Sequence, residues 1–180
     1  NREAKYEITV KANSATATYD GKEHEAVGVE TYEFTVEGNS YTVSGLSTED
    51  PKQKDAGSYT NNITGTPVVT DKEGNVVTSE FEVKTENGSL EIGKAAVTLK
   101  SATLSKKYDG NALVNGDTAL EIESGFAEGE GATYNFTGSQ TVVGSSANVF
   151  SYELNGNTNI DNYEISKQEG TLTVTNREAK

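Results

Sequence analysis

Ile8-Thr9-Val10-Lys11, followed by Tyr19-Asp20-Gly21-Lys22, recurs downstream as Val97-Thr98-Leu99-Lys100 and Tyr108-Asp109-Gly110-Asn111. In both copies an alternation of apolar and polar residues, typical of a half-buried β-strand, precedes an Asp-Gly turn. The second copy follows the first by 89 residues at both motifs (97 − 8 and 108 − 19). One spacing shared by two separate motifs indicates an internal duplication.

The duplication continues at smaller spacings. Ala56-Gly57-Ser58 aligns with Val143-Gly144-Ser145 at an offset of 87 (143 − 56), and Phe81–Ile92 aligns with Tyr163–Val174 at an offset of 82 (163 − 81). Offsets that hold within strands and fall between them indicate that loops changed length while the strands were kept. We therefore predict two β-rich repeat modules in tandem.

A longer repeat joins the two ends of the chain. Residues 1–5, Asn-Arg-Glu-Ala-Lys, recur as residues 176–180, which gives a period of 175 residues (176 − 1). We expect module 1 to span 1–93, module 2 to span 94–175, and 176–180 to start the next repeat. The joint Gly93-Lys94-Ala95-Ala96 is much shorter than a flexible Gly/Ser linker, which favours a semi-rigid string of modules.

The fold class predicted is all-β: two elongated β-sandwich or β-grasp-like modules with little or no helix. Asn87-Gly88 separates two alternating runs, and Glu169-Gly170 does so in the second half, which predicts that each module closes with a β-hairpin. A further tight turn is predicted at 71–75. One short helical turn is expected at most, near 47–50 or 115–119. Immunoglobulin-like and β-grasp-like strand orders both remain open.

The composition excludes several classes of function. The net charge of −13, from 28 acidic and 15 basic residues, disfavours nucleic acid and anionic membrane surfaces as partners. No apolar stretch is long enough to insert into a membrane as a helix. Cys, Met and Trp are absent, so no side chain is easily oxidised, which suits an extracellular setting.

Several motifs resemble a known family. Tyr19-Asp20-Gly21, Asp55-Ala56-Gly57-Ser58-Tyr59 and the closing Phe81–Ile92 resemble the YDG/MBG-type tandem repeats of bacterial cell-surface adhesins, and Lys107-Tyr108-Asp109-Gly110 and Asn162–Val174 do so in the second half. The resemblance covers nearly the whole chain, and the composition is similar to that of Firmicutes surface proteins. It implies an exported, wall-attached protein of many β-rich modules, without catalytic residues.

The residue types that usually carry catalysis do not form a recognisable active-site motif in this sequence. His24 is the sole histidine, and Leu113 stands at its equivalent position, so we expect an exposed bystander. Carboxylate pairs occur at Glu121/Glu123, Glu128/Glu130 and Glu49/Asp50, as chance allows in so acidic a chain. We predict no enzymatic activity, no catalytic residues and no cofactor.

Residues that suit a calcium site, a glycan-binding surface and an isopeptide bond all occur in the chain. The loops 155–161 and 71–75 carry alternate side-chain oxygens that suit calcium, but the first holds a single carboxylate, so no metal site is predicted. Five strand tyrosines could form a glycan platform, although packing explains them better: Tyr32, Tyr41, Tyr59, Tyr134 and Tyr152. An isopeptide bond would need a buried lysine beside an amide or carboxyl group, and Lys11 and Lys100 hold equivalent positions. The closing strands Leu90–Ile92 and Leu172–Val174 contain no Asn or Asp, which disfavours such a bond.

The function predicted is a non-catalytic stalk repeat of a bacterial cell-surface adhesin, which extends a binding head from the cell wall. The alternative is an adhesive module that itself binds a host glycan, a mucin or a protein. The expected partners are neighbouring repeat modules of the same polypeptide, with host glycan or protein as a further partner under the alternative. The expected location is extracellular, anchored to the wall through regions outside residues 1–180.

Overall fold

The computed structural model describes residues 5–176, and contacts within the chain divide it into two compact units. The first unit comprises Asn1–Thr18 and Lys22–Gly93, and the second comprises Tyr19–Gly21 and Lys94–Lys180. The division after Gly93 coincides with the position where one copy of the sequence repeat gives way to the other. Of the predicted start of a further repeat at 176–180, residues 177–180 lie outside the described part.

The first unit consists of short strands and one single-turn 3₁₀ helix. Its elements are β1 (Tyr6–Lys11), β2 (Ala15–Thr18), β3 (His24–Glu25), β4 (Glu33–Val36), β5 (Asn39–Thr48), β6 (Lys52–Gln53), β7 (Gly57–Asn61), β8 (Ile63–Asp71), η1 (Thr78–Glu80), β9 (Phe81–Glu86) and β10 (Gly88–Gly93).

The second unit is built in the same way. Its elements are β11 (Ala95–Lys100), β12 (Leu104–Lys107), β13 (Ile122–Ser124), β14 (Ala132–Phe136), β15 (Gly144–Ala147), β16 (Phe150–Leu154), η2 (Ile160–Asn162), β17 (Tyr163–Gln168) and β18 (Thr171–Thr175). The all-β prediction is confirmed. None of the helices among residues 5–176 has the length and apolar character needed to cross a bilayer.

The helical turns lie elsewhere than predicted. Both 3₁₀ helices come directly before a late strand, β9 or β17. Ser47 and Thr48 instead continue the β5 ladder opposite β8, because their exposed and half-buried side chains alternate as a strand requires. At Asn115 the carbonyl accepts a hydrogen bond from the Thr118 N–H at 3.1 Å, which closes a turn rather than a helix.

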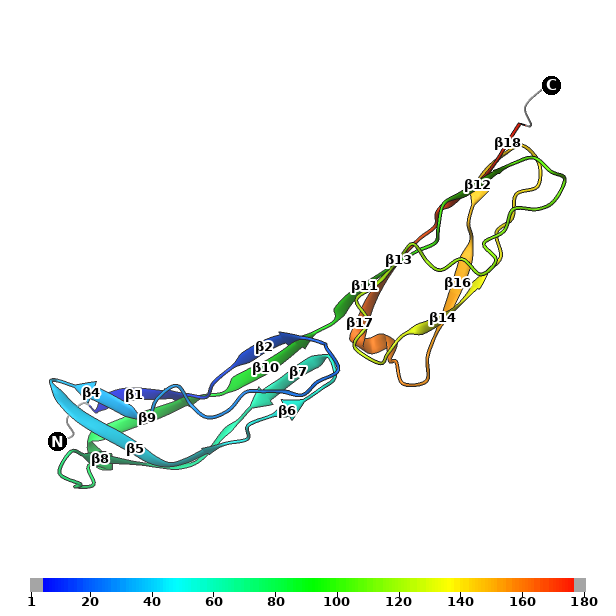
Figure 1. Ribbon diagram of the computed structural model, residues 1–180. Helices are drawn as coiled ribbons and strands as arrows, with labels where there is room; N and C mark the ends of the chain where they lie inside the picture. Colours follow the sequence, from blue (N-terminus) through cyan, green and yellow to red (C-terminus); the bar gives the residue numbers. More distant parts are fainter. Residues whose placement is uncertain (1–4, 177–180) are drawn as a thin grey trace. The chain divides into compact units, whose positions relative to one another are not determined.

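The first two strands of each unit pair in parallel with its last two strands. In the first unit β1 pairs with β9 and β2 pairs with β10. In the second unit β11 pairs with β17 and β12 pairs with β18 (Figure 1). The last strand of each unit also pairs on its other side, antiparallel, with β7 in the first unit and with β15 in the second.

The register of these ladders is the same in both units. Ile8 faces Val83 in the first unit and Val97 faces Ile165 in the second. Val97 follows Ile8 by 89 residues (97 − 8) and Ile165 follows Val83 by 82 (165 − 83), which are the offsets of the sequence repeat. The β2–β10 and β12–β18 ladders keep the same two offsets. A single pattern of strand pairing therefore occurs twice.

The predicted closing hairpins are wrong. β9 and β10 do not pair with each other: β9 pairs with β1, and β10 pairs with β2 and β7. The chain bends at Asn87-Gly88 and passes from one sheet to the next. Asn87 supports this bend, because its Oδ1 accepts a hydrogen bond from the Ile63 N–H at 3.0 Å.

Glycine is needed at these bends for space rather than for a positive φ. A Cβ at Gly88 would lie 2.1 Å from the Asn13 carbonyl oxygen, and a Cβ at Gly170 would lie 2.4 Å from that of Ala102. The strand switch at Glu169-Gly170 thus repeats the first one. The predicted Asp-Gly turns are confirmed, since Gly21 and Gly110 have φ values of 80° and 82°.

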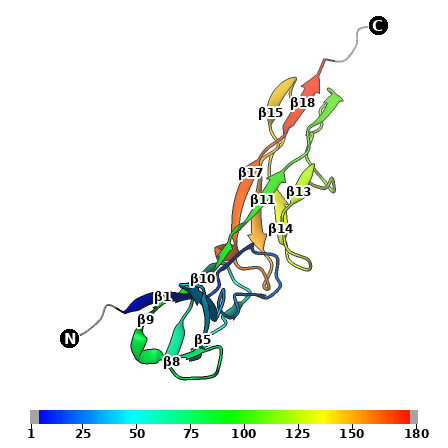
Figure 2. The same cartoon turned by 90° about the vertical axis from the view of Figure 1, so that its left-hand side faces the viewer.

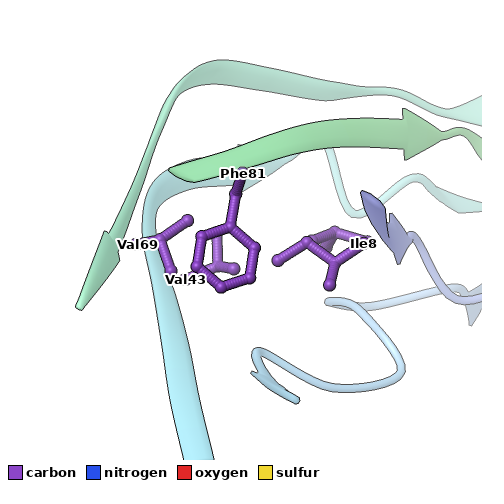
Figure 3. Packing of buried hydrophobic residues seen from close by; sticks show 5 residues of the cluster. Ile8, Val43, Val69 and Phe81 are labelled. Carbon is purple, nitrogen blue, oxygen red and sulfur yellow. The ribbon is translucent and has the colours of Figure 1, made fainter. Parts of the chain in front are cut away.

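Each unit has its own apolar core. In the first unit Phe81 of β9 packs among Ile8, Val43 and Val69, which come from β1, β5 and β8 (Figure 3). In the second unit the buried apolar side chains come from β11, β16, β17 and β18: Ala95, Val97, Leu99, Phe150, Tyr163, Leu172 and Val174. Burial of each large apolar side chain contributes about 1.5–3 kcal/mol.

Candidate functional site

A buried asparagine marks the strand switch in each unit. Asn61 has 0% exposure. Its Nδ2 donates to the Asn13 carbonyl at 3.0 Å, and its Oδ1 accepts from the Asp50 N–H at 2.9 Å. A buried amide without partners would cost several kcal/mol, so these bonds fix the position of the chain between β1 and β2.

Asn148 is the equivalent residue of the second unit, at an offset of 87 (148 − 61). It also has 0% exposure, and its Nδ2 donates to the Ala102 carbonyl and to Asn115 Oδ1, both at 2.9 Å. The Ser101 hydroxyl donates to the Asn148 carbonyl at 2.7 Å. The two asparagines occupy equivalent positions of the sequence repeat. Because an asparagine is usually exposed, the sequence does not predict that they are buried at the strand switch.

His24 is half-buried rather than exposed as predicted. It lies in β3 opposite Gln53 of β6. In the second unit Leu113 faces Gln140 in an isolated bridge, and these residues stand at the same offsets of 89 (113 − 24) and 87 (140 − 53). A leucine at the equivalent place indicates that the position serves packing.

The carboxylate pairs do not converge on a common point. Glu123 accepts a short hydrogen bond from the Tyr134 hydroxyl, whereas Glu121 lies 3.5 Å from Lys100 Nζ. In another pair, Glu49 accepts from Asn62 Nδ2 at 2.9 Å, while Asp50 accepts from the main chain and a hydroxyl. The four carboxylates of these two pairs thus make separate structural bonds.

Asp50 is held in its charged form by hydrogen bonds. Its Oδ1 accepts from the Thr48 hydroxyl at 2.6 Å and from the Gly28 N–H at 2.9 Å. These bonds, that from Thr48 most strongly, lower the pKa of Asp50 below its ordinary value. The carboxylate therefore joins the connection after β3 to the end of β5.

Glu130 and Tyr163 form a partly buried pair in the second unit. The Tyr163 hydroxyl donates to Glu130 Oε1 at 2.6 Å, and the hydroxyl of Tyr19, which groups with this unit, donates to Oε2 at 2.5 Å. Burial, followed by the bond to Glu130, raises the pKa of Tyr163 to about 12. A phenol that keeps its proton at neutral pH acts here as a structural donor.

The candidate calcium loops use their oxygens internally. Asp71 Oδ1 accepts from the N–H groups of Glu73 at 3.0 Å and Asn75 at 2.9 Å, which closes the turn between β8 and the segment before η1. Within 155–161, Asn159 Oδ1 accepts from the Asp161 N–H at 2.9 Å. Among residues 5–176, no group of three or more His, Cys, Asp or Glu could hold a metal ion.

The five candidate tyrosines are all half-buried. Tyr41 packs edge-on against Phe81 with ring centroids 4.8 Å apart, and Tyr134 packs against Phe150 at 6.2 Å. The Tyr59 hydroxyl donates to the Asp55 carbonyl at 2.8 Å. The rings of Tyr41 and Tyr134 are thus engaged in packing against phenylalanine, as the strand interpretation predicts.

The lysines considered for an isopeptide bond are not buried beside an amide. Lys11 is exposed, and Lys100 is paired with Glu121 through an ion pair whose side chains are 31% and 46% exposed. Such a pair is solvated and contributes about 1 kcal/mol or less to stability.

Two surface grooves are shallow and polar. One lies over the antiparallel pair β14 and β16 and is lined by hydroxyl, amide and carboxylate side chains together with two tyrosines: Thr133, Tyr134, Asn135, Ser151, Tyr152 and Glu153. The other covers β4 and β5 with a similar set of polar residues. Neither groove brings together a nucleophile, a base and a charge-stabilising group.

The hydrogen bonds described above thus hold strands and turns in position. Buried amides, short tyrosine–carboxylate bonds and carboxylate-capped turns all serve to place strands. Comparison of the chain with models of known families, with curated proteins and with solved structures found no match.

Proposed function

We propose that the chain is a non-catalytic stalk segment of a bacterial cell-surface adhesin, whose β-modules hold a binding head away from the cell wall. The repeated ladder carries this proposal. Two units keep one strand register at offsets of 89 and 82 (97 − 8 and 165 − 83), although their loops differ in length. Selection for a repeated scaffold, rather than for one unique cleft, accounts for such a pattern.

The surface and the titratable groups support the same role. A net charge of −13 keeps neighbouring copies soluble and apart. The carboxylates that approach other polar groups bind main-chain N–H groups, hydroxyls, side-chain amides or lysines, as Asp50, Asp71 and Glu49 do. Side chains engaged in this way stabilise the fold and leave recognition to another part of the protein.

The partners under this proposal are neighbouring repeat modules of the same polypeptide. The location is outside the cell, and attachment to the wall comes through regions beyond residues 1–180. The resemblance to YDG/MBG-type repeats supports both statements.

Surface display tests the stalk role. A reporter head is joined to a wall anchor through no copy, one copy or two copies of residues 1–175, and its accessibility to a bulky antibody is measured on intact bacteria. The matched control replaces each copy by a Gly/Ser linker of equal residue number, which behaves as a flexible coil. Accessibility should increase with copy number and exceed that of the control.

Accessibility that is independent of copy number, or equal to that of the flexible linker, would contradict the stalk role. A glycan array and a mucin-binding assay with the 180-residue chain test the alternative of direct binding. Dose-dependent and saturable binding there would replace the proposal, because a stalk needs no ligand of its own.

A further inference from the structure

The chain enters each unit on two successive strands that pair in parallel with the two successive strands on which it leaves. The second unit begins with β11 and ends with β18. β11 pairs with β17 over six residue pairs, and β12 pairs with β18 over four. β11 lies beside β17 in both views (Figures 1 and 2). The first unit repeats the arrangement, with six pairs between β1 and β9 and four between β2 and β10.

These ladders are nearly continuous across the strand switch. The Ser101 N–H donates to the Gln168 carbonyl at 3.1 Å, directly after β11, and the Tyr108 N–H donates to the Thr175 carbonyl at 2.8 Å, directly after β12. In the first unit the Ala12 N–H donates to the Glu86 carbonyl at 2.9 Å in the same way. The entering and leaving segments are therefore bonded along most of their length.

Two of the paired strands in the second unit are also held on their other sides. β18 lies between β12 and β15, and β11 lies between β13 and β17. Their inward side chains belong to the core, since Leu99 and Leu172 have 0% exposure and Val97 has 1%. Pulling either strand out of the unit requires the loss of two ladders and of buried apolar contacts together.

Tension along the backbone acts on the start of the first strand and the end of the last strand. Because the first two strands pair in parallel with the last two, and the force is applied at opposite ends of these ladders, both ladders are sheared and their hydrogen bonds share the load. A force across one end of the ladder would break the bonds one after another. The resistance of a domain to force follows its rate of unfolding.

We propose that each unit is a mechanical clamp, which bears tension transmitted along the chain through the two parallel ladders that its first two strands form with its last two strands. This extends the proposed stalk role, since a spacer needs only length, whereas an adhesin stalk under flow must also stay folded while it is pulled.

Optical tweezers test the clamp on the 180-residue chain by comparing two pulling directions on one unit. The chain has no cysteine, so two engineered cysteines give a single defined attachment. The pair K94C with N176C pulls the second unit lengthwise. The pair K94C with D161C pulls across the end where Ala95 faces Tyr163. All three positions are exposed, and circular dichroism checks that both variants fold alike.

At equal loading rate we expect the lengthwise unfolding force to be several-fold higher than the crosswise force. The first unit offers an independent repeat, with K5C and K94C lengthwise against K5C and E80C crosswise, because Tyr6 faces Phe81. A lengthwise force equal to or below the crosswise force would overturn the clamp.

The clamp and the stalk role fail separately. If antibody accessibility increases with copy number but the two pulling directions give equal forces, the chain is a spacer without a clamp. If the lengthwise force is higher but accessibility does not change, the clamp holds and the stalk role is lost.

Discussion

Replacing Gly88 by alanine tests the strand switch that the sequence did not predict. Gly88 has no positive φ, so alanine meets no backbone penalty there, and the cost is steric. The added Cβ would lie 2.1 Å from the Asn13 carbonyl oxygen and 2.7 Å from that of Ala12. Both contacts involve main chain, which cannot rotate away as a side chain can.

The expected magnitude follows from two opposing terms. Overpacking that displaces backbone costs about 1–3 kcal/mol and sometimes more, and the contacts at Gly88 belong at the upper end because two carbonyls must move. Alanine in place of glycine within a strand gains about 0.5–1 kcal/mol. We therefore expect Gly88→Ala to lower the free energy of unfolding of the first unit by about 2 kcal/mol.

Two alanine variants in the same unit serve as controls. At Gly93, also in β10, the nearest atom to an added Cβ is the Ala17 carbonyl oxygen at 3.9 Å, so no clash arises and only the gain of about 0.5–1 kcal/mol from alanine should remain. At Gly38 no atom lies within 4 Å but φ is 82°, so its cost, about 1 kcal/mol, measures left-handed backbone strain alone.

Hydrogen exchange followed by mass spectrometry is the suitable assay, because it reports on each unit separately. Gly88→Ala should reduce protection in β1, β9 and β10, while β11, β17 and β18 in the second unit keep theirs as an internal reference. Equal protection in Gly88→Ala and Gly93→Ala would refute the steric account of the strand switch.

Three smaller predictions concern polar groups. Asn61→Ala leaves main-chain partners buried and unpaired, so it should cost about 2 kcal/mol in chemical denaturation followed by tyrosine fluorescence; a loss below about 0.5 kcal/mol would contradict this. The pKa of Asp50 is lowered by folding, so its carboxylate adds stability above its unfolded pKa of about 3.9, and this stability is lost as pH falls through the folded pKa. Asp50→Asn should therefore weaken the dependence of the denaturation midpoint on acid pH. An unchanged dependence would argue against this role of Asp50. The raised pKa of Tyr163, about 12, adds stability below pH 10 that is lost as pH increases toward 12. An absorbance titration of Tyr163→Phe should therefore lose a late-titrating tyrosine, and retention of that step would disprove the assignment.

The sequence predicted what depends on side-chain alternation. The first and last strands of both units follow from residues such as Val97 and Leu172, whose apolar and polar neighbours alternate. The Asp-Gly turns follow from the need for a positive φ, as at Gly21 and Gly110. These features are local, so a single sequence specifies them.

The sequence did not predict which strands pair. Asn87-Gly88 has the composition of a hairpin turn, and nothing local distinguishes that turn from a bend between sheets. The difference lies at Asn13, some seventy residues earlier, whose carbonyl occupies the space beside Gly88. For the same reason the burial of Asn61 could not be foreseen, since its partners Asn13 and Asp50 lie in other segments.

The two copies show which residues the ladder requires. Some core positions differ between the units: Ile8 corresponds to Val97 and Phe81 to Tyr163. Apolar volume of about the right size therefore satisfies the core. At the strand switch, by contrast, both copies keep glycine, at Gly88 and at Gly170, and a buried asparagine beside it. The glycine is required because the two backbones approach so closely that a Cβ has no room. The asparagine is required because a buried main-chain carbonyl there needs a hydrogen-bond donor. A similar residue therefore cannot replace either of them. The switch, rather than the core, thus fixes the parallel pairing on which both the repeated scaffold and its resistance to tension depend.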